Sequence, residues 1–102
     1  MVYERGRRIT GEKVSICYLE RDEEGIVPGF VASGRRVGKA YLRNRAKRLM
    51  REVFRKLEGR FETKGLWIVF IAAFCPVNTT LRELTEDVES SLVKVGLISK
   101  FG

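Results

Sequence analysis

The sequence has no histidine and only two cysteines, Cys17 and Cys75, so sites that depend on histidine or cysteine side chains have few residues available. Both cysteines stand within apolar stretches, and neither belongs to a Cys-x-x-Cys pair. We therefore expect two buried, reduced thiols. A structural zinc site, which needs several cysteine or histidine ligands, is not expected.

Long hydrophobic runs and a secretion signal are also missing. The longest apolar run, Leu66 to Cys75, has about half the length needed to span a bilayer. The first residues, Met1 to Tyr3, lead directly into charged residues rather than into an apolar signal segment. With 102 residues, 44% of them hydrophobic, we expect one small domain over residues 1–102, located in the cytoplasm and without a membrane segment.

Negative charge is scarce in one part of the chain, and this imbalance is the most informative feature of the composition. The segment from Arg35 to Lys56 holds ten of the 20 Lys and Arg residues but only one of the 13 acids, Glu52. The rest of the chain is slightly acidic, so the net charge of +7 arises in this segment. A localised excess of this kind indicates a surface that binds a polyanion.

Hydrophobic patterning predicts an α+β protein, a two-layer sandwich with elements in the order β-β-α-β-α and a mixed sheet. Residues 1–12 are expected to form a basic lead-in and residues 97–102 a tail. Alternating apolar residues predict strands over 13–19 and 27–33, which should pair as a hairpin around a charged turn. The apolar run 66–74 predicts a central strand buried on both faces.

Two helices are predicted. The first begins at residue 39 or 40 and ends at Leu57. The second follows Thr80, which forms a capping box with the acid three residues later, and ends at Gly96.

Helical spacing divides the first helix into two faces. An apolar stripe, predicted to cover the sheet, consists of Leu42, Ala46, Leu49, Met50, Val53 and Leu57. A cationic face, within roughly 100° of arc, consists of Asn44, Lys47, Arg48, Arg51 and Arg55. Because like charges at helical spacing repel one another, we expect a nucleic acid to relieve them. An anionic membrane surface and plain solvation are the alternatives.

The segment Gly34-Arg35-Arg36-Val37-Gly38-Lys39-Ala40 superficially resembles a nucleotide-binding P-loop. It has one residue too few between its glycines, and Ala40 stands where a Ser or Thr would bind Mg²⁺. Nucleotide hydrolysis is therefore not expected. Backbone amides and basic side chains at a helix N-terminus still suit a phosphate, here one that belongs to a nucleic acid.

The helix and the loop before it carry a family resemblance. Gly38-Lys39-Ala40, Arg43-Asn44-Arg45, Lys47-Arg48 and Arg51-Glu52 are similar to the RNR helix of the bacterial ribonuclease P protein family. The order of the predicted elements also resembles that family, and the resemblance covers about residues 5–96.

The resemblance implies a protein subunit of ribonuclease P, the endoribonuclease that removes the 5′ leader from precursor tRNA. In this family the RNA subunit carries the catalysis with bound Mg²⁺, and the protein, which has no catalytic residue, binds that RNA and the leader. The expected partners are thus ribonuclease P RNA and precursor tRNA, and the protein itself is expected to be a monomer without a metal site. The RNA-binding residues carried over by position are Arg35, Arg36, Lys39, Arg43, Asn44, Arg45, Lys47, Arg48 and Arg51, to which the cationic face adds Arg55.

Individual roles stay open at this point. Asn44 contacts RNA, orients a neighbouring arginine, or is a plain exposed polar residue. Tyr18 and Phe30 could contact the leader as stacking surfaces, and a place in the hydrophobic core is the other interpretation. Glu52 is expected to pair with Arg48, Arg55 or Lys56 at helical spacing rather than to act as a general base.

The sequence also departs from the family pattern. The family usually begins with an amphipathic helix that carries aromatic residues and lines the leader-binding cleft. Before Lys13 the only aromatic residue is Tyr3, so no such helix is expected here. Phe74 stands where the family has a basic residue after the central strand. A general RNA-binding or ribosomal-type protein without a processing role is therefore the alternative function.

Overall fold

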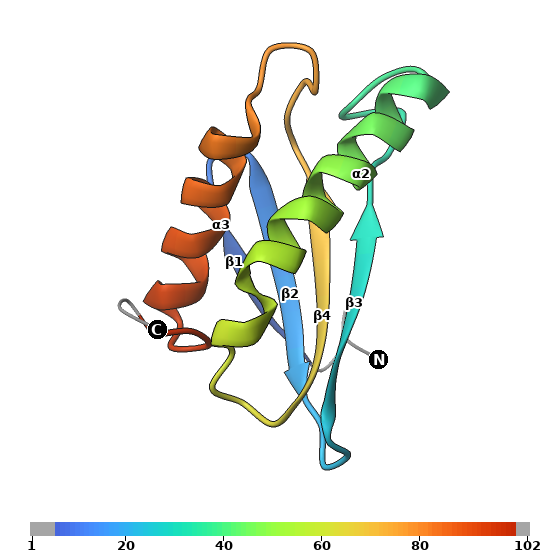
Figure 1. Ribbon diagram of the computed structural model, residues 1–102. Helices are drawn as coiled ribbons and strands as arrows, with labels where there is room; N and C mark the ends of the chain where they lie inside the picture. The colour runs from blue at the N-terminus through green and yellow to red at the C-terminus, as the bar shows by residue number, and fades with distance from the viewer. Residues whose placement is uncertain (1–5, 100–102) are drawn as a thin grey trace.

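The structure is a computed structural model and describes residues 6–99. Tyr3 and the last three residues of the expected tail lie outside this range. A four-stranded sheet is covered by two helices (Figure 1), which confirms the expected α+β class with a mixed sheet. In chain order the elements are β1 (Arg7–Thr10), β2 (Val14–Glu20), β3 (Gly25–Val31), α2 (Ala40–Leu57), the short 3-10 helix η1 (Glu58–Arg60), β4 (Gly65–Ala72) and α3 (Leu81–Lys94).

Residues 7–10, expected to belong to a loose lead-in, form strand β1 instead. The strand pairs antiparallel with β2, with Arg7 opposite Tyr18 and Thr10 opposite Ser15. Ile9, its one apolar residue, packs against the core, while the other three are exposed. A single apolar side chain in four residues is too weak a pattern to predict a strand. β1 forms because the edge of β2 offers backbone groups to pair with.

β2 and β3 do not pair with each other, so the expected hairpin is wrong. β4 lies between them, antiparallel to β2 and parallel to β3, and the sheet order is β1-β2-β4-β3. Phe70 of β4 thus has Ile16 on one side and Phe30 on the other. The most apolar strand takes a central position, whereas β3 stands at the edge, where Pro28 and its missing N–H are tolerated.

The connection from β3 through α2 to β4 is a parallel crossover of uncommon hand. In Figure 1 both strands run upward, α2 lies in front of the sheet, and β4 lies to the left of β3. This arrangement makes the crossover left-handed, whereas about 98% of such connections in proteins are right-handed. The hand therefore distinguishes this fold from most βαβ units.

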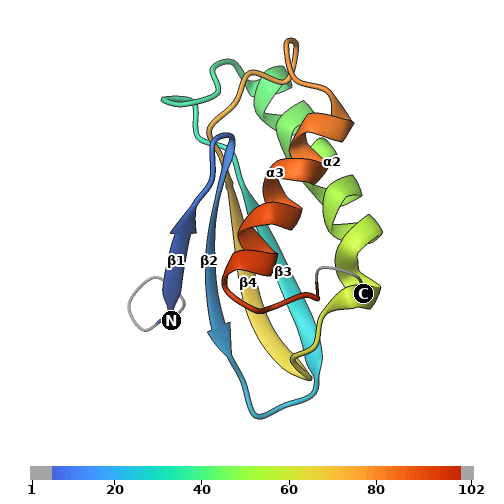
Figure 2. The same cartoon turned by 90° about the vertical axis from the view of Figure 1, so that its left-hand side faces the viewer.

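β4 is buried on one face only, which corrects the expectation of a strand covered on both sides. Leu66, Ile68 and Phe70 are almost fully buried beneath the helices. Trp67, which alternates with them, is 39% exposed on the opposite face, and Val69 is half-buried there. Both helices lie on the same side of the sheet (Figure 2), so the other side, here called the open face, has no helix of the described residues against it.

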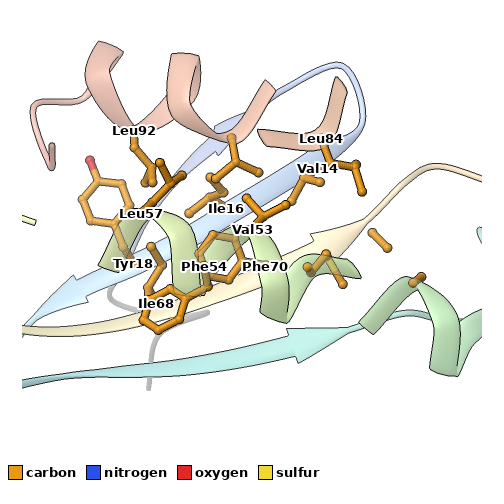
Figure 3. Packing of buried hydrophobic residues seen from close by; sticks show 14 of the residues in the cluster. Val14, Ile16, Tyr18, Val53, Phe54, Leu57, Ile68, Phe70, Leu84 and Leu92 are labelled. Carbon is orange, nitrogen blue, oxygen red and sulfur yellow. The ribbon is translucent and has the colours of Figure 1, made fainter. Parts of the chain in front are cut away.

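The core lies between the sheet and the two helices (Figure 3). The predicted stripe of α2 is confirmed at Ala46, Met50, Val53 and Leu57, while Leu42 and Leu49 are half-buried at its margin. α3 adds Leu84, Val88 and Leu92. Each large side chain of this kind stabilises the fold by about 1.5–3 kcal/mol when fully buried, so the packing fixes how α2 is presented.

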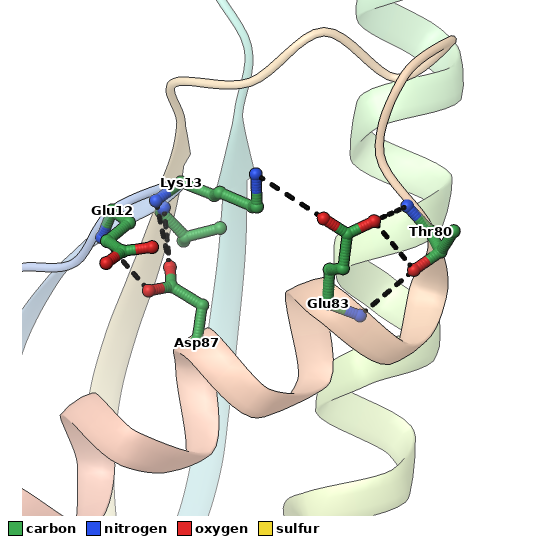
Figure 4. Close-up of polar contacts among 6 residues, drawn as sticks. Glu12, Lys13, Thr80, Glu83 and Asp87 are labelled. Carbon is green, nitrogen blue, oxygen red and sulfur yellow. Dashed lines mark hydrogen bonds and ion pairs between the residues drawn. The ribbon is translucent and has the colours of Figure 1, made fainter.

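The predicted start of α3 is confirmed. The Thr80 hydroxyl accepts a hydrogen bond from the Glu83 N–H, and the Glu83 carboxylate accepts one from the Thr80 N–H, both at 3.2 Å. One turn further on, the Asp87 carboxylate accepts hydrogen bonds from three consecutive N–H groups of the β1–β2 turn, each at 3.0 Å. Figure 4 shows both contacts, of which the second holds the start of β2 and the turn before it to the helix.

The two thiols differ in their surroundings. Cys17 in β2 is buried, as expected, whereas Cys75 is exposed in the loop after β4. Its neighbours Phe74 and Pro76 point inward and occupy the core positions of that loop. Phe74 therefore serves packing rather than contact with solvent.

Candidate nucleic-acid interface

The loop between β3 and α2 is a compact series of turns. The Val37 N–H donates to the Ser33 carbonyl at 2.9 Å, and the Gly38 N–H donates to the Gly34 carbonyl at 3.1 Å. Gly38 has a φ of +112°, which favours glycine, and it redirects the chain into α2. A Cβ at Gly34 would lie 3.4 Å from Arg43 Nη1, so this arginine of the helix lies against the loop.

The N-terminus of α2 is open. Lys39 occupies the N-cap position with an extended backbone, its side chain makes no capping hydrogen bond, and the first turn contains no acid. Helices normally satisfy their first N–H groups with a Ser, Thr, Asp or Asn cap. Here those groups and the positive end of the helix dipole remain available to an anion.

The structure brings the predicted RNA-binding residues onto one continuous surface made of this loop and the outer side of α2, here called the cationic surface. Its half-buried members are Arg43 and Lys47. Its exposed members are Arg35, Arg36, Lys39, Asn44, Arg45, Arg48, Arg51 and Arg55. Asn44 makes no side-chain hydrogen bond among the described residues, so the exposed-residue and RNA-contact interpretations both remain.

No member of the cationic surface is neutralised by an acid within the described part of the chain. All four ion pairs found there involve other basic residues: Lys13, Arg21, Arg60 and Arg82. The expected pairing of Glu52 is absent from them, so this expectation is wrong. The like charges therefore repel one another without internal compensation, and a bound polyanion would relieve them.

Tyr18 and Phe30, the candidates for leader contact, lie on the helix-covered side of the sheet. Tyr18 is 8% exposed within the core. The Phe30 ring stacks on Phe70 at a centroid distance of 5.5 Å and meets Phe54 edge-on. The structure thus favours the core interpretation for both residues. Phe30 also supports the cationic surface, because the guanidinium of Arg51 lies 5.5 Å from its ring centroid.

Two exposed aromatic residues were not among the sequence candidates. Tyr41, in the first turn of α2, is 67% exposed, and Trp67 lies on the open face of the sheet. The guanidinium of Arg21 lies over the Trp67 ring at 5.2 Å. Tyr41 could have been recognised, because it falls on the polar side of the wheel. Trp67 could not, because its strand was expected to be covered on both faces.

Two other classes of site receive no support. Residues 6–99 contain no group of three His, Cys, Asp or Glu side chains placed to hold a metal ion. Within the same residues, no helix has both the length and the apolar character to cross a membrane.

The fold and this surface together define a small α+β protein that presents an uncompensated cationic helix to a polyanion. Comparison with known proteins makes this assignment specific. Residues 1–96 match the Ribonuclease P family. The chain is 35% identical to the ribonuclease P protein component of Symbiobacterium thermophilum, covering 99% of this chain and 87% of the relative. It is 34% identical to that of Alkaliphilus metalliredigens, covering 97% and 87%.

Solved structures agree with the fold. The RNase P protein of Staphylococcus aureus superimposes with a TM-score of 0.80 at 20% identity, covering 96% of this chain and 88% of the other. The RNase P protein of Thermotoga maritima gives a TM-score of 0.80 at 24% identity, covering 91% and 86%.

The chain therefore belongs to the ribonuclease P protein family. It is a subunit of the holoenzyme that processes the 5′ end of tRNA, in which the RNA carries the catalysis, and ribonuclease P RNA is its partner.

Proposed function

We propose that this protein binds the catalytic RNA through the cationic surface and, with its open face, contacts the 5′ leader of precursor tRNA. The observation that carries the proposal is the uncompensated charge of α2. An 18-residue helix keeps its apolar stripe in the core and exposes basic residues that no acid of residues 6–99 pairs with. Lys and Arg in this arrangement suit successive phosphates, and arginine adds bidentate contacts.

The open face suits a single-stranded leader better than Tyr18 and Phe30 do. It exposes Trp67 near the start of the inner strand β4, with Val27 opposite it on the neighbouring strand β3 and Val31 further along that strand. The flat indole ring offers a surface for base stacking, and the Arg21 guanidinium that lies against it is itself paired with Glu23, so stacking rather than charge is the contact expected here. We assign the leader contact to this face, because Tyr18 and Phe30 pack against the core on the other side of the sheet.

The proposal also covers metal binding, oligomeric state and location in the cell. Mg²⁺ would be bound by the RNA subunit, as membership of this family implies. We further propose that the protein acts as a monomer on its RNA, in the cytoplasm, where precursor tRNA is made.

Reconstitution tests the processing role. The chain is added to a bacterial ribonuclease P RNA at low Mg²⁺, and cleavage of a precursor tRNA is measured. We expect the protein to restore cleavage and to bind precursor more tightly than mature tRNA. No stimulation at any protein concentration would contradict the processing role and leave the general RNA-binding alternative.

Trp67→Ala tests the leader contact within the same assay. It should reduce the preference for precursor over mature tRNA by about five- to a hundredfold, the range for one stacked base, while affinity for the catalytic RNA stays unchanged. Val77→Ala, a change at an exposed apolar residue of the loop between β4 and α3, is the matched control. An unchanged preference in Trp67→Ala would exclude this ring as the leader contact.

A further inference from the structure

Tyr41 is an exposed aromatic residue that the fold does not use. It is 67% exposed, lies outside the core cluster, and takes part in none of the ring, cation–π or side-chain hydrogen-bonding contacts found among residues 6–99. Tyrosine is a poorer helix former than alanine, so the first turn of α2 gains nothing from it. The residue therefore calls for an explanation outside folding.

Exposure alone does not indicate a binding role, because single apolar residues are common on protein surfaces. The position of Tyr41 is what distinguishes it. Asn44 and Arg45 follow it by three and four residues and Arg48 by seven, which places all of them on the same side of the helix. At 1.5 Å per residue, Arg45 lies about 6 Å and Arg48 about 10.5 Å further along the axis.

The neighbouring charges indicate which ligand the ring would meet. A flat ring beside a row of cations matches the arrangement of proteins that bind unpaired bases, where the ring stacks and the cations contact phosphates. A membrane surface fits less well, because a helix lying on lipid needs its apolar stripe free, and here that stripe is buried against the sheet.

We propose that Tyr41 stacks on an unpaired base of the catalytic RNA, while Arg45 and Arg48 contact phosphates next to that base. The inference rests on the proposed binding of this RNA through the cationic surface and adds a non-electrostatic contact to it. It assigns the amino end of α2 to a single-stranded or looped part of the RNA. Regular duplex leaves no base face open for stacking.

The test compares the full chain with Tyr41→Ala and Tyr41→Phe, each bound to a bacterial ribonuclease P RNA over a range of salt concentrations. Tyr41→Ala should weaken affinity by about five- to a hundredfold at every salt concentration, with the salt slope unchanged, because stacking releases no counterions. Tyr41→Phe keeps the ring and should bind within about twofold of the parent protein.

Lys47→Ala is the electrostatic reference and should lower the salt slope by about one unit. If it does so while Tyr41→Ala binds like the parent, the stacking inference is overturned and the RNA-binding surface stands. A Tyr41→Phe protein as weak as Tyr41→Ala would also overturn stacking, in favour of a hydroxyl contact. If neither Lys47→Ala nor Tyr41→Ala has an effect, the cationic surface itself is the wrong interface.

Folding is controlled by the thermal midpoint of each variant. Alanine is the better helix former and Tyr41 buries little surface, so Tyr41→Ala should not lower the midpoint. A lowered midpoint together with weaker binding in Tyr41→Ala, but with full binding in Tyr41→Phe at a temperature where all are folded, still supports the ring as the contact.

Discussion

The two helices lie side by side on one sheet, yet their charges are arranged in opposite ways. α3 begins with a complete capping box, and its acids are paired: Glu83 with Lys13, Glu86 with Arg82, and Glu89 with Arg60. α2 begins without a side-chain cap, has no acid in its first turn, and has no ion pair among the described residues.

The difference indicates that the polar residues of α3 stabilise the fold, whereas the basic residues of α2 are available to bind RNA. Within the described residues, three of the four acids of α3 form ion pairs and the fourth, Asp87, accepts backbone hydrogen bonds, as expected of a helix that serves stability. The basic side chains of α2 form no ion pair with any described residue, at a cost of a few tenths of a kcal/mol for each like-charged pair. We infer that α3 stabilises the free protein, whereas α2 reaches its lowest free energy on RNA.

The largest effect is expected from removing charge from α2. Lys47→Ala combined with Arg51→Ala should weaken binding to ribonuclease P RNA about a hundredfold near 0.1 M salt and lower the salt slope by about two units. Filter-binding or fluorescence titrations over a salt series measure both quantities. Arg82→Ala, an exposed basic residue of α3, is the matched control and should leave the slope unchanged. An equal loss of RNA affinity in Arg82→Ala would mean that α2 and α3 do not differ in their contribution to RNA binding.

The next largest effect is expected from α3 and concerns stability. Asp87→Ala removes the acceptor of three backbone N–H groups and should lower the free energy of unfolding by about 2–3 kcal/mol. Denaturant titration measures the change. Asp22→Ala, in the exposed turn between β2 and β3, should change it by less than about 0.5 kcal/mol. RNA affinity of the folded Asp87→Ala protein should be unchanged, and a large loss would mean that α3 also takes part in binding.

A smaller and opposite pair of effects is expected at the two N-caps. Lys39→Ser supplies the cap that α2 lacks and should raise the free energy of unfolding by about 1 kcal/mol, whereas Thr80→Ala should lower it by a similar amount. Lys39→Ser should also lower the salt slope of RNA binding by about one unit. If Lys39→Ser does not raise the free energy of unfolding, the missing side-chain cap of α2 does not lower the stability of the protein.

The smallest effect is expected from pH. Hydrogen bonds from the backbone N–H and the hydroxyl of Thr80, together with the nearby charge of Lys13, hold the pKa of Glu83 below its ordinary value. Its carboxylate therefore stabilises the fold above the pKa of the unfolded chain, near 4.3, and this contribution is lost as the pH falls through the lowered value. Glu83→Gln should make unfolding less dependent on pH in this acid range. An identical acid profile for both proteins would contradict the assignment.

The helices could be predicted from the sequence because their signals are local. The start at residue 40, the end at Leu57 and the Thr80 cap follow from spacing within a few turns, and the structure confirms them. The same wheel that located the core stripe also located the cationic surface. A charge pattern does not include Tyr41, although this exposed aromatic residue lies on the same side of the helix.

The sheet could not be predicted in the same way, because its pairing depends on residues far apart in the chain. A short charged turn between two strands favours a hairpin locally, yet β4 pairs with both and displaces that contact. The sequence also does not determine which face of each strand the helices cover. Alternation shows that Tyr18 and Phe30 lie on one side of their strands, but only the packed helices decide that this side is the covered one.

The insertion of β4 between β2 and β3 also has a consequence for the order in which the protein is made. β1 and β2 can pair as soon as they leave the ribosome, but β3 has no partner until residues 65–72 have been synthesised. α2 is synthesised before β4, so its apolar stripe stays exposed until the sheet that buries it has formed. We expect a β1–β2 hairpin alone to be only marginally stable, and the chain to fold in one late step once both β4 and α3, which completes the core, have emerged.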